Sequence, residues 1–424
     1  MKYAYLQFAV NIASLMILVP LFTNFYPPEI LAAFLLVTNF LAIALAIDLA
    51  VLPIFISQGR ASHNRSSGSS GYILLSLAIL LISIVGVPKL TGFYPTYFGD
   101  NFFEINLLLI LSLLLSVTSG ILNIQGSLSR AKKNEALLGF LRVLGIAALV
   151  YFEASFTTIL KFWIICISLN IGLNVFYFSN YTEKYDLVVA MEELSSFKNL
   201  IFRNYILSVG SIFILYGASF VFALFGDVND VAALMLSLKI FQVAKNLAQV
   251  PITFSIHKLS RYYHEKPLVE FKHFLTTEHS KSILIYVLML CCIIASEHLG
   301  IFSFMNIDLL PLQFLLFISL IFLLELNHGN MAQVYIITFK NPFVFGSLLS
   351  GIAIVSLNYY LSSSFSILGV LTVQFLVQVC WNNWYPAYVF SNHLKCNIWE
   401  LLIPNFSLVT SEFEKLKRKI FGVN

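Results

Sequence analysis

Charge is scarce in this sequence of 424 residues: Asp, Glu, Lys and Arg make up 11% of it, whereas hydrophobic residues make up 59%. Soluble globular proteins carry about 25% charged residues, so the composition excludes an ordinary soluble enzyme, and no nucleic-acid partner is expected. Several apolar runs exceed about 18 residues, the length at which a helix can cross a bilayer. Because only helices and closed barrels satisfy their backbone groups inside a membrane, the sequence predicts an all-α polytopic membrane protein.

Metal-binding and catalytic motifs are lacking as well. The five cysteines show no spacing typical of a metal site or a disulfide framework, and we interpret them as packing residues. No Walker A, HExxH or GxSxG motif occurs, which excludes ATP-driven pumping within this chain and the hydrolytic chemistry of those motifs. We therefore expect no metal, no cofactor and no enzymatic activity.

The apolar runs can be arranged as about twelve transmembrane helices with strongly asymmetric connections. Of the 25 Lys and Arg residues, only Lys89 and Lys161 fall on one side, and Arg142, Lys239 and Lys245 lie within spans. All others fall on the opposite side, so the positive-inside rule predicts that both termini are cytoplasmic. The predicted spans are residues 5–25, 30–57, 72–89, 104–128, 136–153, 159–180, 204–226, 231–256, 282–302, 312–339, 343–361 and 366–391.

A short repeat indicates two related halves. The segments Leu49–Ser57 and Leu247–Ser255 match at five of nine positions, and both end the second span of a six-span half. Parallel repeats of this kind relate two halves by an axis along the membrane normal, with a substrate site between them. We therefore predict an N-terminal six-helix lobe at 1–200 that includes a linking loop at 181–203, a C-terminal six-helix lobe at 201–391, and a cytoplasmic tail at 392–424.

The stretch Val231 to Ile256 carries the strongest functional candidates. On a helical wheel its polar residues fall within an arc of roughly 120°, opposite an apolar face. A lysine near the middle of a membrane helix is costly unless it faces protein or water. We interpret the polar face as the lining of a hydrated cationic chamber; the alternative is that its lysines are structural, paired with carboxylates or carbonyls, or snorkelling. The face comprises Lys239, Gln242, Lys245, Asn246, Gln249 and Thr253.

Four further ionisable residues lie within predicted spans. Arg142, two turns from the cytoplasmic end of its span, either snorkels to the headgroups or forms a third contact to an anion, which its guanidinium suits. Asp48 either pairs with a basic partner or titrates with a coupling ion. Glu325 and His328 share a helix face one turn apart, either as a structural pair or as a proton relay.

Rows of polar residues recur on other spans. Hydrogen bonding between helices explains each row by itself, and together the rows fit a wide polar interior for hydroxyl-rich cargo. The rows are Gln7, Asn11 and Ser14; Ser112, Ser116, Ser119 and Asn123; Asn170 and Asn174; and Gln374, Gln378, Asn382 and Tyr385.

The first two spans resemble a known family. The sequence LMILVPLFTNFYPPEILAAFLLVTNFLAIALAIDLAVLPIFISQGRA has Pro-Leu-Phe-Thr before a short turn and Asp48 late in the second span, before a basic loop. It resembles polysaccharide flippases of the multidrug/oligosaccharidyl-lipid/polysaccharide (MOP) exporter superfamily, and the segment Asn246–Pro251 is similar to the second half of that family. Many relatives have a glycine-containing turn after the acid, where this chain has Leu and Ala.

This resemblance implies a MATE-like fold and the function of a Wzx-type flippase in the bacterial inner membrane. The cargo would be an undecaprenyl-pyrophosphate-linked oligosaccharide for O-antigen, in lipopolysaccharide biosynthesis, or for a similar surface polysaccharide, moved by ion-coupled alternating access. Lys239, Lys245 and Arg142 would contact the pyrophosphate or an acidic sugar, with Gln242, Asn246 and Gln249 as further contacts. Asp48 and the Glu325–His328 pair would couple transport to protons or sodium. Membrane lipids, a polysaccharide polymerase and a chain-length regulator are the implied partners.

Two other classes of function stay open from the sequence. A multidrug or cation antiporter of the same superfamily favours an acidic chamber, which two lysines on one lining face oppose. A membrane glycan polymerase is less favoured, because the predicted outward loops are too short for a catalytic domain.

Overall fold

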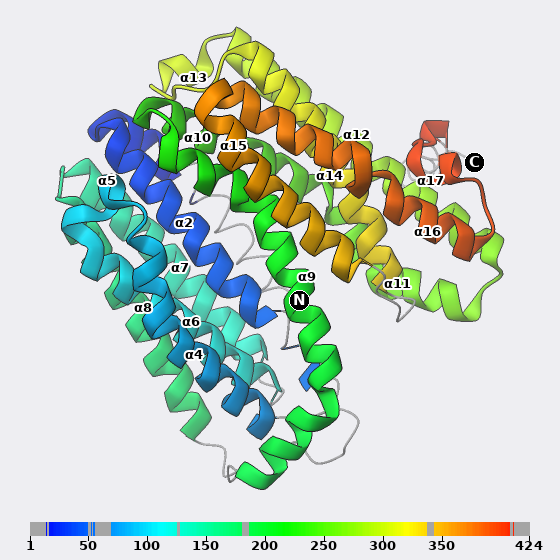
Figure 1. Cartoon of the computed structure of the whole chain (residues 1–424), viewed down its shortest axis with the longest axis horizontal. Coiled ribbons are helices and arrows are strands. Elements are labelled where there is room, and N and C mark those ends of the chain that lie inside the picture. Colours follow the sequence, from blue (N-terminus) through cyan, green and yellow to red (C-terminus); the bar gives the residue numbers. More distant parts are fainter. Residues whose placement is uncertain are drawn as a thin grey trace, which may run out of the picture. The chain divides into compact units, whose positions relative to one another are not determined.

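The computed structural model describes residues 14, 17–49, 52, 54–55, 69–124, 128–179, 186–336, 343–407 and 410. These residues are almost entirely helical, and no strand occurs among them, which confirms the predicted all-α class (Figure 1). Residues 17–25 form a helical segment before the first labelled helix. The labelled elements are α2 (Pro28–Leu49), α4 (Ser69–Thr91), α5 (Pro95–Phe98), η1 (Gly99–Asn101), α6 (Phe102–Ile124), α7 (Leu128–Tyr151), α8 (Phe156–Ser179), α9 (Leu187–Phe225), α10 (Val228–Ala248), α11 (Val250–Glu265), α12 (Leu268–His298), α13 (Ile301–Phe304), α14 (Leu312–Ile336), α15 (Val344–Val377), the π-helical turn η2 (Gln378–Asn382), α16 (Trp384–Leu394) and α17 (Ile398–Leu402).

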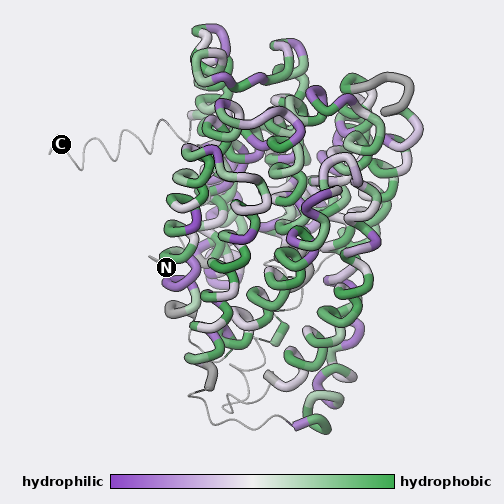
Figure 2. Tube along the Cα trace, turned by 90° about the vertical axis from the view of Figure 1, so that its left-hand side faces the viewer, coloured by the Kyte–Doolittle hydropathy of each residue, from purple (hydrophilic) through white to green (hydrophobic). Residues whose placement is uncertain are grey.

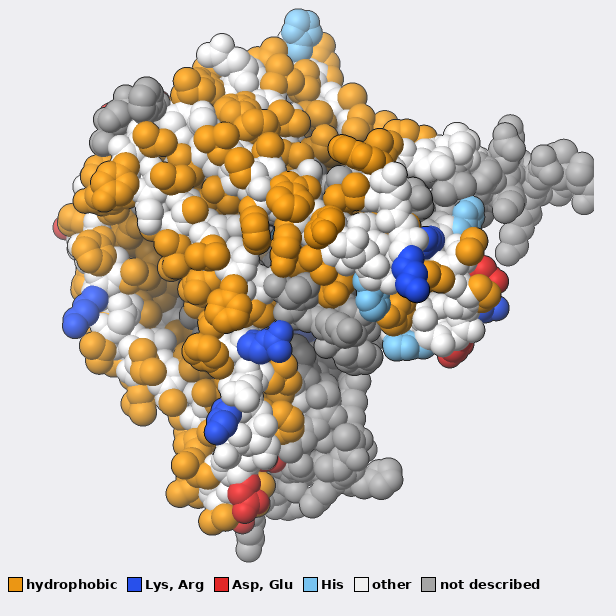
Figure 3. Space-filling model, turned by 45° about the vertical axis from the view of Figure 1, so that its right-hand side comes forward, with side chains coloured by type: hydrophobic (Ala, Val, Ile, Leu, Met, Phe, Trp, Pro, Cys, Tyr) orange, Lys and Arg blue, Asp and Glu red, His pale blue; other side chains and the backbone are white. Residues whose placement is uncertain are grey.

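Length and composition place these helices in a membrane. Nine helices within the described ranges are long and apolar enough to cross a bilayer, and Pro28–Ile43 forms a shorter apolar helix. Hydrophobic residues predominate along their lengths (Figure 2), and large hydrophobic side chains such as Ile82 and Phe140 are exposed at 72% and 51%. Hydrophobic side chains cover much of the face drawn in Figure 3. Since soluble monomers rarely expose extended apolar surfaces, the chain is a multi-pass membrane protein.

The chain divides into two compact units. Unit 1 comprises Met1–Ala232 and Met305–Ile307, and unit 2 comprises Ala233–Phe304 and Asp308–Asn424. In unit 1, α6 packs against α2, α4, α7 and α8; in unit 2, α14 packs against α11, α12, α15 and α16. Helices α6 and α14 therefore each pack against four other helices of their own unit. The predicted lobe boundary at residue 200 stays a prediction.

The predicted linking loop at 181–203 is wrong for most of its length. Helix α9 begins at Leu187, and Asp186 caps it by accepting hydrogen bonds from the backbone N–H groups of Val188 and Val189. A side-chain oxygen at this position satisfies donors that the first helical turn leaves without partners. The prediction failed because charged residues here lie on a helix that packs against α2 and α4, rather than in a solvated loop.

The predicted helix at 231–256 is two helices. Helix α10 ends at Ala248, and α11 begins at Val250 with Pro251 in its first turn. Proline has no N–H and its ring clashes with the carbonyl four residues earlier, so a helix commonly breaks just before it. The polar face predicted for one straight helix is thus divided at Gln249.

Helix α15 folds back on itself. The hydroxyl of Ser350 donates to Oδ1 of Asn382 over 2.7 Å, although 32 residues of straight helix would separate them by roughly 48 Å. The two limbs lie side by side in Figure 1, and the first limb, Val344–Leu361, is a candidate span by itself. The chain therefore reverses between Leu361 and Ile367, which agrees with the separate spans predicted at 343–361 and 366–391.

Candidate functional site

A ladder of three residue pairs joins α10 and α11 to α14 in unit 2. Each pair lies four residues after the previous one on both helices, so the helices run in the same direction with a constant separation of 80 residues. The first rung is an ion pair, the second is an amide packed on a glycine, and the third is a hydrogen bond of 3.3 Å. The pairs are Lys245–Glu325, Gln249–Gly329 and Thr253–Gln333.

In the middle rung the Gln249 side chain packs directly on the backbone of Gly329. A Cβ added to Gly329 would lie 2.5 Å from Nε2 of Gln249, so a larger residue here would have to displace the end of that side chain. Gln249 was predicted on the polar face, but its partner was not predicted, because that partner has no side chain.

Lys245 and Glu325 form a buried ion pair. Nζ lies 2.6 Å from Oε1, and the two side chains are exposed at only 8% and 13%. The ammonium also lies 5.6 Å from the centre of the Phe322 ring, a cation–π contact. A charge at this depth is costly unless it is paired, so the structural alternative for Lys245 applies in this conformation: its charge is neutralised by a carboxylate on α14.

One turn along α14, His328 binds the backbone of the π-helical turn. Its Nδ1 lies 2.6 Å from the carbonyl oxygen of Asn382, and because a carbonyl only accepts, Nδ1 carries the proton. That carbonyl would pair with the N–H of residue 386 in an α-helix, but Pro386 has none. Instead Asn383 N–H bonds Gln378 over 2.8 Å, one residue further than in an α-helix. His328 thus satisfies a carbonyl that proline leaves without a partner.

A wider group of buried amides surrounds these residues in unit 2. Asn327 donates to Asn383 over 2.7 Å, and Asn330 donates to Ser282 over 2.8 Å. Hydrogen bonds of this kind are expected to stabilise the packing of membrane helices. Within the described ranges several buried amide and imidazole atoms of this group have no protein partner: Oδ1 of Asn327 and Asn330, Nε2 of His279, both amide atoms of Asn358, Oε1 of Gln374 and Gln378, and Nδ2 of Asn382.

Sequence analysis found only part of this group. The row Gln374, Gln378 and Asn382 was predicted, and all three are buried at 7%, 2% and 2% exposure. His279, Asn327, Asn330 and Asn358 were missed. The signal that could have found two of them is the polar cluster Glu-Leu-Asn-His-Gly-Asn at 325–330, which interrupts an otherwise apolar span.

The other predicted residues of α10 are less buried. Lys239 and Gln242 are half-buried, and Asn246 is exposed. The predicted polar face therefore separates into Lys245, which lies against α14, and Asn246, which points away from the core of its unit. Asp48 ends α2, but its side chain is outside the described part of the molecule, as are Gln7 and Asn11.

Arg142 lies deep in unit 1, stacked on an aromatic ring. Its Cζ lies 5.1 Å from the centre of the Trp163 ring on α8. Helix α7 begins at Leu128, before the predicted span at 136–153, so Arg142 lies about four turns, roughly 21 Å, from the start of the helix and about two turns from the start of that span. The side chain reaches Trp163, whose Cα lies roughly 10 Å from the opposite end, where α7 turns into α8. The choice between snorkelling and an anion contact for Arg142 stays a prediction.

The guanidinium of Arg142 has no counter-ion in the described part of the chain. None of the ion pairs there includes it. Trp163 is 5% exposed and its Nε1–H is buried without an acceptor. Donors therefore accumulate at this point of unit 1, and no protein acceptor that the structure describes meets them.

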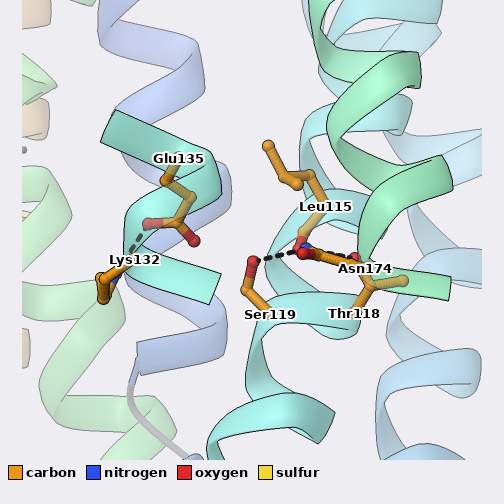
Figure 4. Close-up of polar contacts among 6 residues, drawn as sticks. All are labelled: Leu115, Thr118, Ser119, Lys132, Glu135 and Asn174. Atoms are coloured by element: carbon orange, nitrogen blue, oxygen red, sulfur yellow. Dashed lines mark hydrogen bonds and ion pairs between the residues drawn. The ribbon is translucent and has the colours of Figure 1, made fainter. Parts of the chain in front are cut away.

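The predicted polar row on α6 and α8 joins those two helices. Asn174 donates to Ser119 over 3.1 Å and to Thr118 over 3.4 Å (Figure 4). The separation of 56 residues between Thr118 and Asn174 recurs between Asn101 and Thr157, so α6 and α8 run in the same direction. The Lys132–Glu135 pair in Figure 4 lies at the start of α7 and is partly exposed. No group of three or more His, Cys, Asp or Glu residues within the described ranges is placed to hold a metal ion.

Comparison with known proteins identifies the fold. No protein-family model and no curated protein sequence matches this chain. Among solved structures, the lipid II flippase MurJ in an inward closed conformation is similar with a TM-score of 0.68, at 13% identity, over 97% of this chain and 91% of that one. An outward-facing multidrug resistance MATE family transporter of the MOP superfamily has a TM-score of 0.57, at 12% identity, over 92% and 94%. A MOP superfamily transporter from Pyrococcus furiosus has a TM-score of 0.50, at 13% identity, over 93% and 94%.

These similarities extend over nearly the whole of each chain. The chain therefore has the fold of MOP superfamily transporters, and the predicted MATE-like all-α architecture is confirmed. At 12–13% identity, cargo and coupling have to be argued from this chain's own residues.

Proposed function

We propose that this chain is a flippase that moves an undecaprenyl-pyrophosphate-linked oligosaccharide, the repeat unit of O-antigen or of a similar surface polysaccharide, across the bacterial inner membrane. The fold supports a transporter rather than an enzyme. The similarity to a protein named as a lipid II flippase has a TM-score of 0.68, against 0.57 for a MATE transporter, which favours a lipid-linked cargo.

The observation that carries the anionic part of this proposal is Arg142. An arginine near the middle of a membrane helix is retained only where something compensates its charge. Because no carboxylate in the described part of the chain forms an ion pair with Arg142, we assign the compensating anion to the cargo. Guanidinium presents paired donors that match phosphate oxygens, and the buried N–H of Trp163, which has no acceptor, adds a second type of donor beside it.

Other residues take supporting roles in this proposal. Lys239 is the second contact to the pyrophosphate or to an acidic sugar, with Gln242, Asn246 and Gln249 as polar contacts to the glycan. Lys245 is held by Glu325 and becomes a contact only when that pair opens. Asp48, Glu325 and His328 couple transport to protons or sodium. Both termini of the chain are cytoplasmic. Two lobes open the cargo site alternately to the two sides of the membrane. A polysaccharide polymerase and a chain-length regulator would act on the delivered product.

The cation antiporter is the main alternative, and the charge distribution opposes it. Binding of a cationic drug requires an available carboxylate, whereas Glu325 is neutralised by Lys245. Arg142 forms no ion pair in the described part of the chain, which favours the opposite sign of cargo. A glycan polymerase lacks support in this fold, because the fold is that of transporters.

The test is surface-glycan display in cells that lack the native gene and carry variants at equal protein level. We expect Arg142→Gln to reduce display at least about tenfold, since one charge-assisted contact is worth about 1.5–3 kcal/mol, and Arg142→Lys to retain part of it. Lys133→Gln, at an exposed position on the same helix, is the matched control and should have no effect. Full display by Arg142→Gln, or a change only in drug susceptibility, would contradict the proposal.

A further inference from the structure

The Lys245–Glu325 pair is the one buried ion pair that joins two helices in the part of unit 2 that the structure describes. We propose that it is a proton-switched anion site: Lys245 binds a phosphate group of the cargo only when Glu325 releases it and takes up a proton. This inference rests on the proposed function, because it assigns the order in which proton and anionic cargo bind. Under this proposal one proton binds together with the cargo, as in symport, and does not leave in exchange for the cargo, as in antiport.

Charge balance links the anion to a proton. With Lys245 ionised and Glu325 ionised, the pair is neutral and holds no anion. If a phosphate replaced the carboxylate at Nζ, an uncompensated carboxylate would remain buried beside it, which is strongly unfavourable. Protonation of Glu325 removes that cost, so anion binding and proton uptake favour each other by equal amounts.

Few other groups could compensate the charge of Glu325. The ionisable groups nearest Glu325 are Lys245 on α10 and Tyr286 on α12, whose hydroxyl is already bonded to the Ser319 carbonyl over 2.8 Å. On α14 itself, His328 has Nδ1–H committed to Asn382. Other titratable groups face α14 further along: His279 of α12 beside Asn330, and His393 and Tyr385 of α16 near Tyr335. Within the described residues no second cation forms an ion pair with the carboxylate, so a proton is the remaining partner once Lys245 leaves it.

The geometry of the ladder lets the ion pair open by itself. The ion pair is the first of three rungs, and the next two are uncharged contacts between α11 and α14. Opening the ion pair therefore requires only that the long Lys245 side chain turn away from α14, while the other two rungs stay in place.

The experiment measures binding of farnesyl pyrophosphate to the full-length protein in phosphatidylcholine nanodiscs, between about pH 5.5 and pH 8, together with proton uptake in weak buffer. The pyrophosphate of the probe titrates by itself, and the pH dependence of binding to Glu325→Gln measures that contribution. After this correction, the affinity of the wild type for the probe should rise as pH falls, by up to about tenfold per pH unit for one linked proton. The wild type should take up protons on binding and Glu325→Gln should not. Glu278→Gln alters a comparable pair on α12 and should behave as wild type.

The outcomes separate the two proposals. At pH 8 we expect Glu325→Gln to bind the probe more tightly than the wild type, because Lys245 then has no carboxylate to leave. The double variant Lys245→Met with Glu325→Gln, which removes the cation and keeps the site neutral, should lose that gain in affinity. Binding by wild type with the pH profile of Glu325→Gln, or without proton uptake, would overturn the switch and leave the anionic cargo supported. Failure of every variant, Glu325→Gln included, to bind the probe would overturn the anionic cargo itself. Proton uptake by the wild type tests the switch even if a variant fails to fold.

Discussion

Glu193 on α9 accepts a hydrogen bond over 2.8 Å from the backbone N–H of Gly71, in the first turn of α4. The carboxylate is 5% exposed, and its position at a helix N-terminus places negative charge where the helix dipole stabilises it. Gly71 is required there, because a Cβ would lie 2.7 Å from Oε2 of Glu193. This contact fixes α9 to α4 in unit 1 at the segment predicted as a loop.

We predict that Glu193→Ala destabilises the protein, whereas Glu192→Ala does not. Removal of the buried acceptor leaves the Gly71 N–H without a partner, which costs about 1–3 kcal/mol. Glu192 is exposed on the same turn and provides a matched control. Thermal unfolding of the detergent-purified protein, followed by size-exclusion chromatography, should show a lower Tm for Glu193→Ala alone. Equal Tm values for the two variants would refute this role.

The contrast between these neighbours shows what sequence patterns could and could not predict. Most helices could be predicted from the long apolar runs, because a chain that crosses the lipid has to satisfy its backbone hydrogen bonds within a helix. The sequence Met-Glu-Glu-Leu-Ser-Ser at 191–196 has no apolar run, so only tertiary packing shows that one of its two acids is buried. The same limit applies to Lys245, whose depth was predictable but whose partner, 80 residues away, was not.

Backbone features were the least predictable part of the site. Pro386 and Asn382 were visible in the sequence, but the π-helical turn depends on where the neighbouring α14 presents His328. Likewise, the sequence does not indicate that Gly329 contacts the side chain of Gln249. Arg142 was placed correctly in an apolar helix, but the start of α7 was not predicted, because its polar residues Leu-Ser-Arg-Ala-Lys-Lys-Asn-Glu at 128–135 do not resemble a membrane helix.

The reversal within α15 makes a prediction about cross-linking. In a background without the native cysteines, Ser350→Cys combined with Asn382→Cys should form a disulfide under mild oxidation, because the two side chains meet at 2.7 Å. The pair Leu349→Cys with Leu376→Cys is the control, since both side chains are exposed at 64% and 47%. A site for a specific protease is inserted between the two limbs. After cleavage, the two fragments stay together on a non-reducing gel only if the disulfide has formed. Cross-linking of the control alone would contradict the hairpin register.

The contact between His328 and the Asn382 carbonyl makes the final prediction, a double-mutant cycle with Pro386. His328→Leu removes the donor and leaves a buried carbonyl unsatisfied, which should cost about 1–3 kcal/mol in the free energy of unfolding. Pro386→Ala restores an N–H that can satisfy the same carbonyl within the helix. In the Pro386→Ala background His328→Leu should therefore cost less, and the two changes should be non-additive by about 0.5 kcal/mol or more. His328→Asn, whose amide can still donate, should cost less than His328→Leu. If the effects of the two substitutions on the unfolding midpoint were strictly additive, Pro386 would not be the reason that the Asn382 carbonyl needs His328 as a donor.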